Sequence, residues 1–305
     1  GRALREQGQA EQSVRAFSRI AGEPHFYGQL AAEELGRRVQ LPPRAAAPTR
    51  EELAEVAGNP GLQRALALYR LDMRPEATRE WNWTIRGMAD RMLLAAAELA
   101  RRNEAWDRAI STADRTVASH DYALRYPAPY SEVLLAQARN HELEEHWVLG
   151  LVRQESRFVA SAKSSAGASG LMQLMPATAR WVARKVGLRN YSWSRVTDVD
   201  INATLGTAYL KQVLADGDGS MVLAAAGYNA GPGRARRWRG AQPIEGAIYA
   251  ESIPFNETRD YVKKVMANTV LYAAVLGGSV RPLKEQLGTI AARVPMERVA
   301  AAAVH

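Results

Sequence analysis

The chain has 305 residues, of which 47% are hydrophobic and 24% charged, so its composition is that of an ordinary globular protein of two or three domains. Forty Lys and Arg against 32 Asp and Glu give a formal net charge of +8, which favours acidic partners such as nucleic acid, anionic lipid or an acidic polysaccharide. No apolar run approaches the roughly 18 residues of a membrane helix, and the absence of cysteine excludes disulfides, thiolate zinc sites and cysteine nucleophiles.

Helices dominate the expected secondary structure, because apolar residues recur at intervals of three and four and Ala, Leu, Arg and Glu abound. Two helical stretches are expected before the proline-rich segment 41–48, one through Val14, Phe17 and Ile20 and the other over 26–35. Three more are predicted over 61–71, 75–102 and 106–116. No segment shows the alternation of a strand, so the predicted fold class is all-α.

The composition changes after residues 126–130, where prolines at 127 and 129 form a stiff, non-helical connector and mark a domain boundary. Beyond this connector, polar residues interrupt otherwise apolar helix faces and glycines cluster at 167, 170, 227, 231 and 233. We therefore expect the chemistry of the protein to lie in this C-terminal part.

A carboxylate interrupts the apolar face of the helix predicted over 146–158. Val148, Leu151 and Val152 occupy positions i, i+3 and i+4, and Glu155 follows at i+7. One interpretation is structural, either an ion pair with a neighbouring Arg or a helix that ends before residue 155. The other is a buried general acid, because burial raises the pKa of a carboxyl group and keeps it protonated near neutrality.

Three further clusters also allow both a structural and a functional interpretation. Residues 167–170 form a small-residue turn before a Met-rich segment, which suits either core packing or an adaptable binding surface. Tyr228 and Asn229 lie between glycines, which suits either a binding site or a helix C-cap with Asn229 in the left-handed conformation. Residues 251–262 suit an extended loop before a final helix, with Glu257 in its first turn, or a further part of a site.

These four clusters, in this order, resemble the soluble lytic transglycosylases that cleave bacterial peptidoglycan. The matching segments are 153–158 (RQESRF), 164–179 (SSAGASGLMQLMPATA), 228–234 (YNAGPGR) and 251–262 (ESIPFNETRDYV). Asn202, Gly206, Tyr209 and Leu210 also fit the family pattern, whereas Gly227 stands where Ala or another small residue is expected. The resemblance weakens upstream and stops near Gly288.

The resemblance implies a lysozyme-like catalytic domain over 126–287. It also implies a helical linker domain over 59–125 and, over 1–58, the end of an α-superhelical, U-shaped domain. Much of that superhelical ring is expected to be missing, so the chain is expected to be a fragment of a longer protein. No role is assigned to the tail, residues 288–305, and over 289–305 we expect a short amphipathic helix or a frayed end.

Mapped residue by residue, the resemblance makes Glu155 the sole catalytic acid and base. The implied substrate-binding residues line the glycan groove (Ser164, Gln173 and Met175), contact the sugar or hold the acid (Tyr228 and Asn229), and complete the site (Glu251 and Tyr261). The implied reaction breaks the bond between N-acetylmuramic acid and N-acetylglucosamine without water, because the sugar's own C6 hydroxyl closes onto C1 to give a 1,6-anhydro end. It requires no metal and no organic cofactor.

Ordinary glycosidases use two carboxylates, and the candidates for a second one are Asp198 and Asp200, which helix capping also explains. One alternative function is a lysozyme-type hydrolase that uses the same acid with water. Another is a non-catalytic glycan-binding scaffold, against which the lone carboxylate of Glu155 argues. No nucleic-acid partner is expected, because no regular basic stripe is interleaved with aromatic residues.

The family also implies a location and a partner. We expect the protein to act in the periplasm of a Gram-negative bacterium, on peptidoglycan glycan strands and in peripheral association with the cell wall. The chain begins at Gly1 without a signal segment, so we expect any targeting peptide to have been removed or left out.

Overall fold

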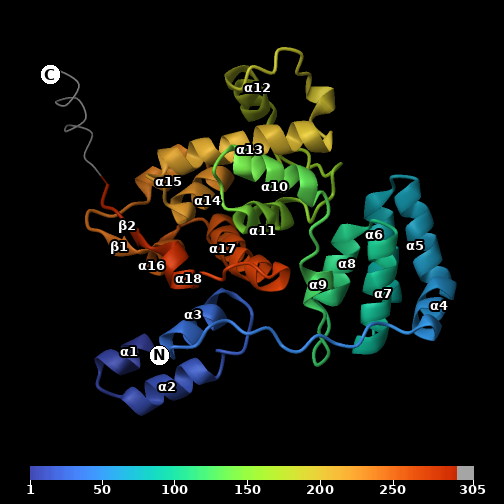
Figure 1. Cartoon of the computed structure of the whole chain (residues 1–305), viewed down its shortest axis with the longest axis horizontal. Coiled ribbons are helices and arrows are strands. Elements are labelled where there is room, and N and C mark those ends of the chain that lie inside the picture. The colour runs from blue at the N-terminus through green and yellow to red at the C-terminus, as the bar shows by residue number, and fades with distance from the viewer. Residues whose placement is uncertain (294–305) are drawn as a thin grey trace.

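The computed structural model describes residues 1–293, which are mostly helical (Figure 1). The first four helices are α1 (Arg2–Glu6), α2 (Ala10–Ser18), α3 (Phe26–Glu34) and α4 (Arg50–Gly58). A helix-free segment, residues 37–49, carries the chain across the molecule from α3 to α4 (Figure 1). The sequence analysis missed α4, although Thr49 and Glu52 form a capping box at its start.

A compact group of helices follows, in which α4 packs with α5 (Pro60–Arg70), α6 (Arg74–Thr84), α7 (Asp90–Arg102) and α8 (Trp106–Ala113). Trp81 is fully buried in their core, and its indole N–H donates to the Thr112 hydroxyl at 2.9 Å. The prediction of one helix over 75–102 is wrong, because the chain turns between α6 and α7, where Gly87 has a φ of 71°.

The remaining helices pack around one large core in the C-terminal half. In chain order they are α9 (Tyr122–Arg125), α10 (Ser131–Asn140), α11 (Glu145–Glu155), α12 (Pro176–Lys185), the 3₁₀ turn η1 (Trp193–Arg195), α13 (Val199–Asp216), α14 (Met221–Ala230), α15 (Pro232–Arg237), α16 (Gly246–Ser252), α17 (Asn256–Leu276) and α18 (Leu283–Leu287). The all-α fold class is confirmed.

Helices α11 and α17 lie in direct contact at the centre of this core. A Cβ atom added to Gly150 of α11 would lie 3.0 Å from the backbone nitrogen of Thr269 of α17, a separation too short for ordinary packing. Glycine therefore allows the two helices to approach closely. This close approach places the C-terminal end of α11 beside the N-terminal half of α17, where the candidate site forms.

Two short strands join the end of the described chain to the C-terminal half. Strand β1 (Ile244–Glu245) pairs antiparallel with β2 (Thr289–Ile290), so that Ile244 lies opposite Ile290. The prediction of no strand is wrong at these residues, because two-residue strands are too short to show an alternating pattern. The helix or frayed end predicted for the tail is likewise wrong at 289–290, and residues 294–305 lie outside the described part of the chain.

The N-terminal helices pack against the C-terminal half, although the α4–α8 group separates the two in sequence (Figure 1). Phe26 of α3 is buried in the large core, and the Gln29 amide donates to the carbonyl of Ala267 in α17 at 3.1 Å. Glu33 accepts a hydrogen bond at 2.9 Å from the backbone N–H of Lys284 in α18. Residues 24–34 thus form one wall of the region around α17.

None of the helices described here is both long and apolar enough to cross a membrane.

Candidate functional site

Glu155 is the last residue of α11 and continues that helix's apolar face. Val148, Leu151 and Val152 are fully buried, while Glu155 keeps partial exposure. The helix therefore does not end before Glu155, and within residues 1–293 the carboxylate has no Arg, Lys or His ion-pair partner. Neither structural interpretation of this carboxylate holds.

The Glu155 carboxyl group is held by Tyr261 of α17, whose hydroxyl donates to Oε1 at 2.5 Å. Burial raises the pKa of Glu155 to about 8, and the hydrogen bond from Tyr261, which favours the charged form, opposes this shift. The negative charge of Glu257 raises the pKa further. At neutral pH the carboxyl group is therefore mostly protonated, which is the state that a general acid needs.

Tyr228 of α14 completes a cluster with Glu155 and Tyr261. Its hydroxyl donates to the backbone carbonyl of Met172 at 2.8 Å, and its ring lies 5.1 Å from that of Tyr209. Burial, and then the charge of Glu155, keep the pKa of Tyr228 and of Tyr261 well above the usual range. The two hydroxyls thus stay protonated and act as hydrogen-bond donors around the acid.

The loop between α11 and α12 is anchored by Asn202, a fully buried residue of α13. Its side-chain oxygen accepts from the backbone N–H of Met172 at 2.7 Å, and its amide donates to the carbonyls of Ser169 and Val196 at 3.2 and 2.7 Å. Gly170 has a φ of 84° and lies directly against this amide, where a Cβ would collide with it. Asn202 therefore fixes the carbonyl of Met172 that holds Tyr228.

The predicted groove residues in this loop stabilise the loop itself. The Ser164 hydroxyl oxygen accepts from the backbone N–H of Ala168 at 3.0 Å. The Gln173 amide donates to the carbonyls of Ala162 and Gly170 at 3.1 and 2.9 Å, and its backbone is left-handed with a φ of 47°. Met175 directly precedes α12 and is 42% exposed. None of these three side chains hydrogen-bonds Glu155.

The two remaining predicted residues lie on α14 and α16. Asn229 is helical, so the left-handed C-cap interpretation is wrong, and Gly231 takes the positive φ of 91° instead. The side-chain oxygen of Asn229 accepts from the Thr258 hydroxyl at 2.7 Å, and this hydrogen bond joins α14 to α17. Glu251 is exposed and helical, not part of an extended loop; it accepts from the Tyr27 hydroxyl at 2.5 Å and lies 3.3 Å from the Lys263 ammonium. Glu251 thus links α16 to α3 and α17, and its hydrogen bond is to Tyr27, not to Glu155.

The structure identifies Glu257 and Asn202 as parts of the site that the sequence analysis did not assign to it. Glu257 was placed only in a first helical turn, and its position relative to Glu155 depends on how α17 packs on α11. The signal that the sequence offered for Asn202 was an Asn within a largely apolar helical segment. Capping does not explain Asp198, since its side chain makes no cap hydrogen bond and pairs with Arg195 at 3.1 Å instead. Among the residues described, no group of three or more His, Asp or Glu side chains is placed to hold a metal ion.

Comparison with protein families finds three matches along the chain. The transglycosylase SLT domain matches residues 132–249, and the soluble lytic murein transglycosylase L domain matches residues 55–118. The soluble lytic transglycosylase helical domain matches residues 252–280, which include all of α17. Together the three matches include Glu155, Tyr228 and Tyr261, whereas Glu251 lies just between two of the matched ranges.

Comparison with individual proteins and solved structures also finds soluble lytic transglycosylases. The chain is 30% identical over 277 residues to the soluble lytic murein transglycosylase of Escherichia coli (strain K12), across 90% of this chain and 43% of that protein. Among solved structures, the lytic transglycosylase Slt of Pseudomonas aeruginosa, an inactive glutamate-to-glutamine mutant, superposes with a TM-score of 0.81 and 34% identity over 92% of this chain and 46% of that one. The complex of the 70-kDa soluble lytic transglycosylase with bulgecin A gives a TM-score of 0.77 and 27% identity over 92% of this chain and 45% of that one. The chain thus spans less than half the length of these relatives.

Proposed function

Because the chain belongs to the soluble lytic murein transglycosylase family, we propose that it is an enzyme that cleaves peptidoglycan glycan strands without water. The bond cleaved is the β-1,4 link between N-acetylmuramic acid and N-acetylglucosamine. The observation that carries this proposal is the Glu155 carboxyl group, which has a pKa of about 8 and is held by the Tyr261 hydroxyl. The inactive glutamate-to-glutamine mutant among the similar structures shows that a glutamate is essential in that relative.

In the first step, protonated Glu155 donates its proton to the glycosidic oxygen, and the bond from that oxygen to C1 of the muramic acid breaks. Positive charge develops at C1, and the oxygen of the substrate's own N-acetyl group shields it. The Tyr261 hydroxyl, which donates to Oε1, stabilises the carboxylate that forms. The low polarity that raises the pKa of Glu155 keeps the proton on the carboxyl group at neutral pH until the leaving oxygen lies against it.

In the second step, ionised Glu155 removes the proton of the C6 hydroxyl of the same sugar, and the C6 oxygen bonds to C1. The proton that left the enzyme in the first step is thereby returned, and the product ends in a 1,6-anhydro ring. An aligned intramolecular hydroxyl reaches effective molarities of about 10⁵ M or more, so it replaces a bound and oriented water. One carboxylate then suffices as both acid and base.

The domain organisation, the groove residues and the location of the protein are inferred on the same basis. We infer a catalytic domain over 126–287, a linker domain over 59–125 and the end of a superhelical domain over 1–58; the L-domain match at 55–118 supports the second of these. We infer that Ser164, Gln173, Met175, Asn229 and Glu251 border the glycan groove around Glu155. A location in the periplasm of a Gram-negative bacterium is inferred from the Escherichia coli relative.

A lysozyme-type hydrolase is the second candidate, and Glu257 is the observation that favours it. Among the described residues, Glu257 is the one carboxylate whose charge acts on the pKa of Glu155. It is exposed in the first turn of α17, so water can reach it, and a second carboxylate near the acid is what a hydrolase of this kind uses.

Digestion of purified peptidoglycan separates the two candidates. We expect muramic acid products that are one water lighter than hydrolysis products and that fail to react in a reducing-sugar assay, because the 1,6-anhydro ring blocks C1. Mass spectrometry of the released products measures the first property. Products of full hydrolytic mass with free reducing ends would instead show that water attacks C1.

A further inference from the structure

A basic pocket of about 480 Å³ lies at the C-terminal end of α12. Its lining comes from α12 and from the segment that follows this helix, residues 187–191. Glu155, Tyr228 and Tyr261 do not line it, and in Figure 1 α12 lies above α13, whereas α11 and α17 lie below it. The α12 pocket is therefore separate from the Glu155 cluster, and its volume is within the range of small-ligand sites.

The pocket forms because the chain reverses direction at Gly187. This residue has a φ of 74°, the left-handed conformation that glycine adopts without strain. The backbone N–H of Leu188 donates to the Ala183 carbonyl at 2.8 Å, and the N–H of Gly187 donates to the carbonyl of residue 184 at 3.3 Å. These are the two hydrogen bonds of a Schellman motif, which ends a helix with a sharp turn. The turn brings the following segment back beside α12.

Three arginines line the α12 pocket, Arg180 and Arg184 from the helix and Arg189 from the segment after it. Arg180 and Arg184 are four residues apart and therefore lie on one face of α12. All three are exposed, and within residues 1–293 none of them has a carboxylate partner or a side-chain hydrogen bond. No Asp or Glu of the described chain lines the pocket. Its positive charge is thus not neutralised by the protein.

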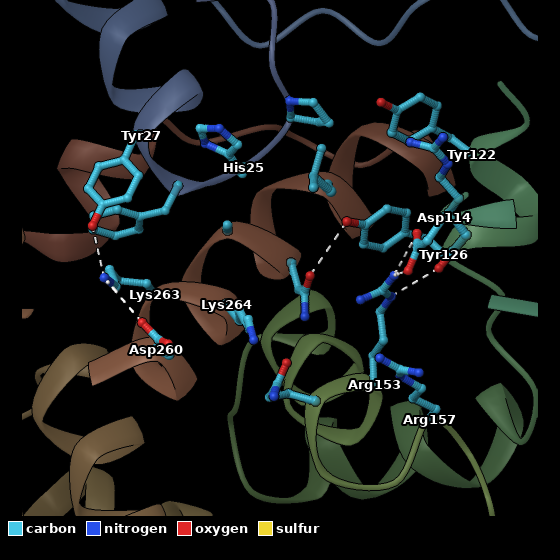
Figure 2. Close-up of a pocket in the computed structure, with 17 residues that line it drawn as sticks. His25, Tyr27, Asp114, Tyr122, Tyr126, Arg153, Arg157, Asp260, Lys263 and Lys264 are labelled. Carbon is cyan, nitrogen blue, oxygen red and sulfur yellow. Dashed lines mark hydrogen bonds and ion pairs between the residues drawn. The ribbon is translucent and has the colours of Figure 1, made fainter. Parts of the chain in front are cut away.

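A larger cavity of about 620 Å³, where α3, α9, α11 and α17 meet, has a different charge balance. There Asp114 lies 3.1 Å from Arg153, and Asp260 lies 3.4 Å from Lys263 (Figure 2). Carboxylates of the protein itself therefore neutralise part of the positive charge in that cavity. The α12 pocket lacks such carboxylates in its described lining, so its guanidiniums are available to an anionic ligand.

The electrostatics of the helix end account for only part of this positive charge. A helix C-terminus carries the equivalent of about half a negative charge, which favours basic residues in the last turn. Arg184 and Lys185 lie in that turn, whereas Arg180 precedes it and Arg189 follows the helix. Like charges four residues apart also destabilise a helix, so Arg180 and Arg184 do not stabilise α12 as a pair. The three guanidiniums therefore exceed what the helix end requires.

Tyr191 adds a neutral donor to the lining of the α12 pocket. Its hydroxyl is buried and has no hydrogen-bond partner among the described residues, although buried hydroxyls in native proteins are normally hydrogen-bonded. Burial raises the pKa of this hydroxyl, against the positive charge of Arg180, so the group stays protonated and can donate to an anion. The other lining residues, Ala183, Gly187 and Leu188, are small or apolar.

A phosphate group fits these donors better than a carboxylate does. Each guanidinium presents a planar fork of N–H donors, and a single fork satisfies both oxygens of a carboxylate. The terminal oxygens of a phosphate monoester point in three directions and carry up to about two negative charges, so they can accept from several guanidiniums at once. The pocket is also larger than a phosphate ion, which leaves room for the organic part of an ester against Leu188.

We propose that the α12 pocket binds a phosphate ester. The phosphate oxygens accept from the guanidiniums and from the Tyr191 hydroxyl, and the organic part of the ester packs against Leu188. This binding does not depend on the proposed cleavage reaction, because the pocket is separate from the Glu155 cluster. A soluble ester and the headgroup of a phospholipid share this chemistry, and the experiments below distinguish the two sources.

Isothermal titration calorimetry of the full chain tests the site with inorganic phosphate and glycerol 3-phosphate, and with acetate at equal ionic strength. We expect both phosphates to bind, the ester more tightly, and their binding to weaken as the NaCl concentration rises. The pocket variant Arg180→Gln/Arg184→Gln/Arg189→Gln should bind glycerol 3-phosphate at least about tenfold more weakly. Absence of binding to the wild-type chain, or acetate binding as tight as that of phosphate, would overturn the proposal.

The matched control is the triple variant Arg19→Gln/Arg50→Gln/Arg70→Gln. It changes the net charge by the same amount and removes three exposed arginines that do not line the pocket. This control variant should bind glycerol 3-phosphate as the wild-type chain does. An equal loss of binding in the control and pocket variants, or no loss in either, would show that the three pocket arginines do not form a site.

Tyr191→Phe tests the hydroxyl without changing the charge of the pocket. We expect glycerol 3-phosphate to bind about threefold more weakly, because one donor is lost. The Tm without ligand should stay equal or rise, since the hydroxyl has no hydrogen-bond partner to lose in the described chain. A lower Tm together with unchanged binding would contradict the assignment of this hydroxyl to the site.

Co-sedimentation with vesicles of phosphatidylcholine and phosphatidylglycerol identifies the source of the phosphate. If a lipid headgroup is the ligand, the wild-type chain and the control variant should sediment with these vesicles, and the pocket variant should not. Binding of glycerol 3-phosphate without sedimentation would identify a soluble ester instead. Equal loss of sedimentation in both triple variants would indicate only the general attraction of a chain of net charge +8, and with unaltered binding of glycerol 3-phosphate in the pocket variant it would refute the site.

Discussion

Glu155→Gln is expected to abolish strand cleavage, with a loss of at least about three orders of magnitude in kcat, while the protein stays folded. Glutamine keeps the shape of the side chain and its ability to accept the Tyr261 hydrogen bond, but it has no proton to transfer. Release of soluble muropeptides from peptidoglycan measures the loss. Glu132→Gln, at an exposed glutamate in the first turn of α10, is the matched control and should cut at the wild-type rate.

The same variant has a thermal signature that depends on pH. The folded state raises the pKa of Glu155 from the ordinary 4.5 to about 8, so it binds a proton more tightly than the unfolded chain does. The contribution of Glu155 to stability is therefore full below about pH 4.5 and is lost as pH rises through about 8. Because glutamine does not titrate, the Tm of Glu155→Gln should exceed that of wild type by an amount that grows between pH 5 and pH 8. A constant difference in Tm, or substantial residual turnover, would show that Glu155 is not the buried acid described here.

Tyr261→Phe has the second largest expected effect, a loss of about 10- to 100-fold in kcat, or about 1.4 to 2.7 kcal/mol. The variant removes the donor that holds Oε1 at 2.5 Å and that stabilises the carboxylate formed in the first step. Because this hydrogen bond lowers the pKa of Glu155, its loss should raise that pKa above about 8 and move the alkaline limb of the kcat/KM profile to higher pH.

Tyr272→Phe is the matched control for this prediction. Tyr272 lies on the same helix, is fully buried and donates its hydroxyl to the Pro127 carbonyl at 2.9 Å, but it does not contact Glu155. Tyr272→Phe should lose about as much stability as Tyr261→Phe does, while the pH profile of kcat/KM stays unchanged. If both variants shifted the profile equally, or neither did, Tyr261 would have only a packing role.

The helical character of the chain and the unusual position of Glu155 were both predictable from sequence, because the apolar periodicity of α11 shows directly which residue breaks it. The boundaries of the helices were harder to predict from the sequence. The turn at Gly87 between α6 and α7 interrupts a continuous run of helix-forming residues, and α4 has only two apolar residues on its buried side, Leu53 and Val56.

The parts of the site that the sequence did not reveal arise from packing between distant segments. Glu257 acts on Glu155 only because Gly150 lets α11 approach α17. Ser164 and Gln173 lie in a segment that was recognisable from its sequence. That their side chains hold the loop between α11 and α12 is known only from the hydrogen bonds in the structure.

Digestion in water enriched in heavy oxygen tests most directly whether Glu155 works as the single carboxylate. If the C6 hydroxyl closes onto C1, the primary muramic acid product takes no oxygen from the solvent, and its mass is the same in heavy and ordinary water. Heavy oxygen at C1 of that product would contradict the account, because it would mean that water, and not the C6 hydroxyl, attacks the sugar.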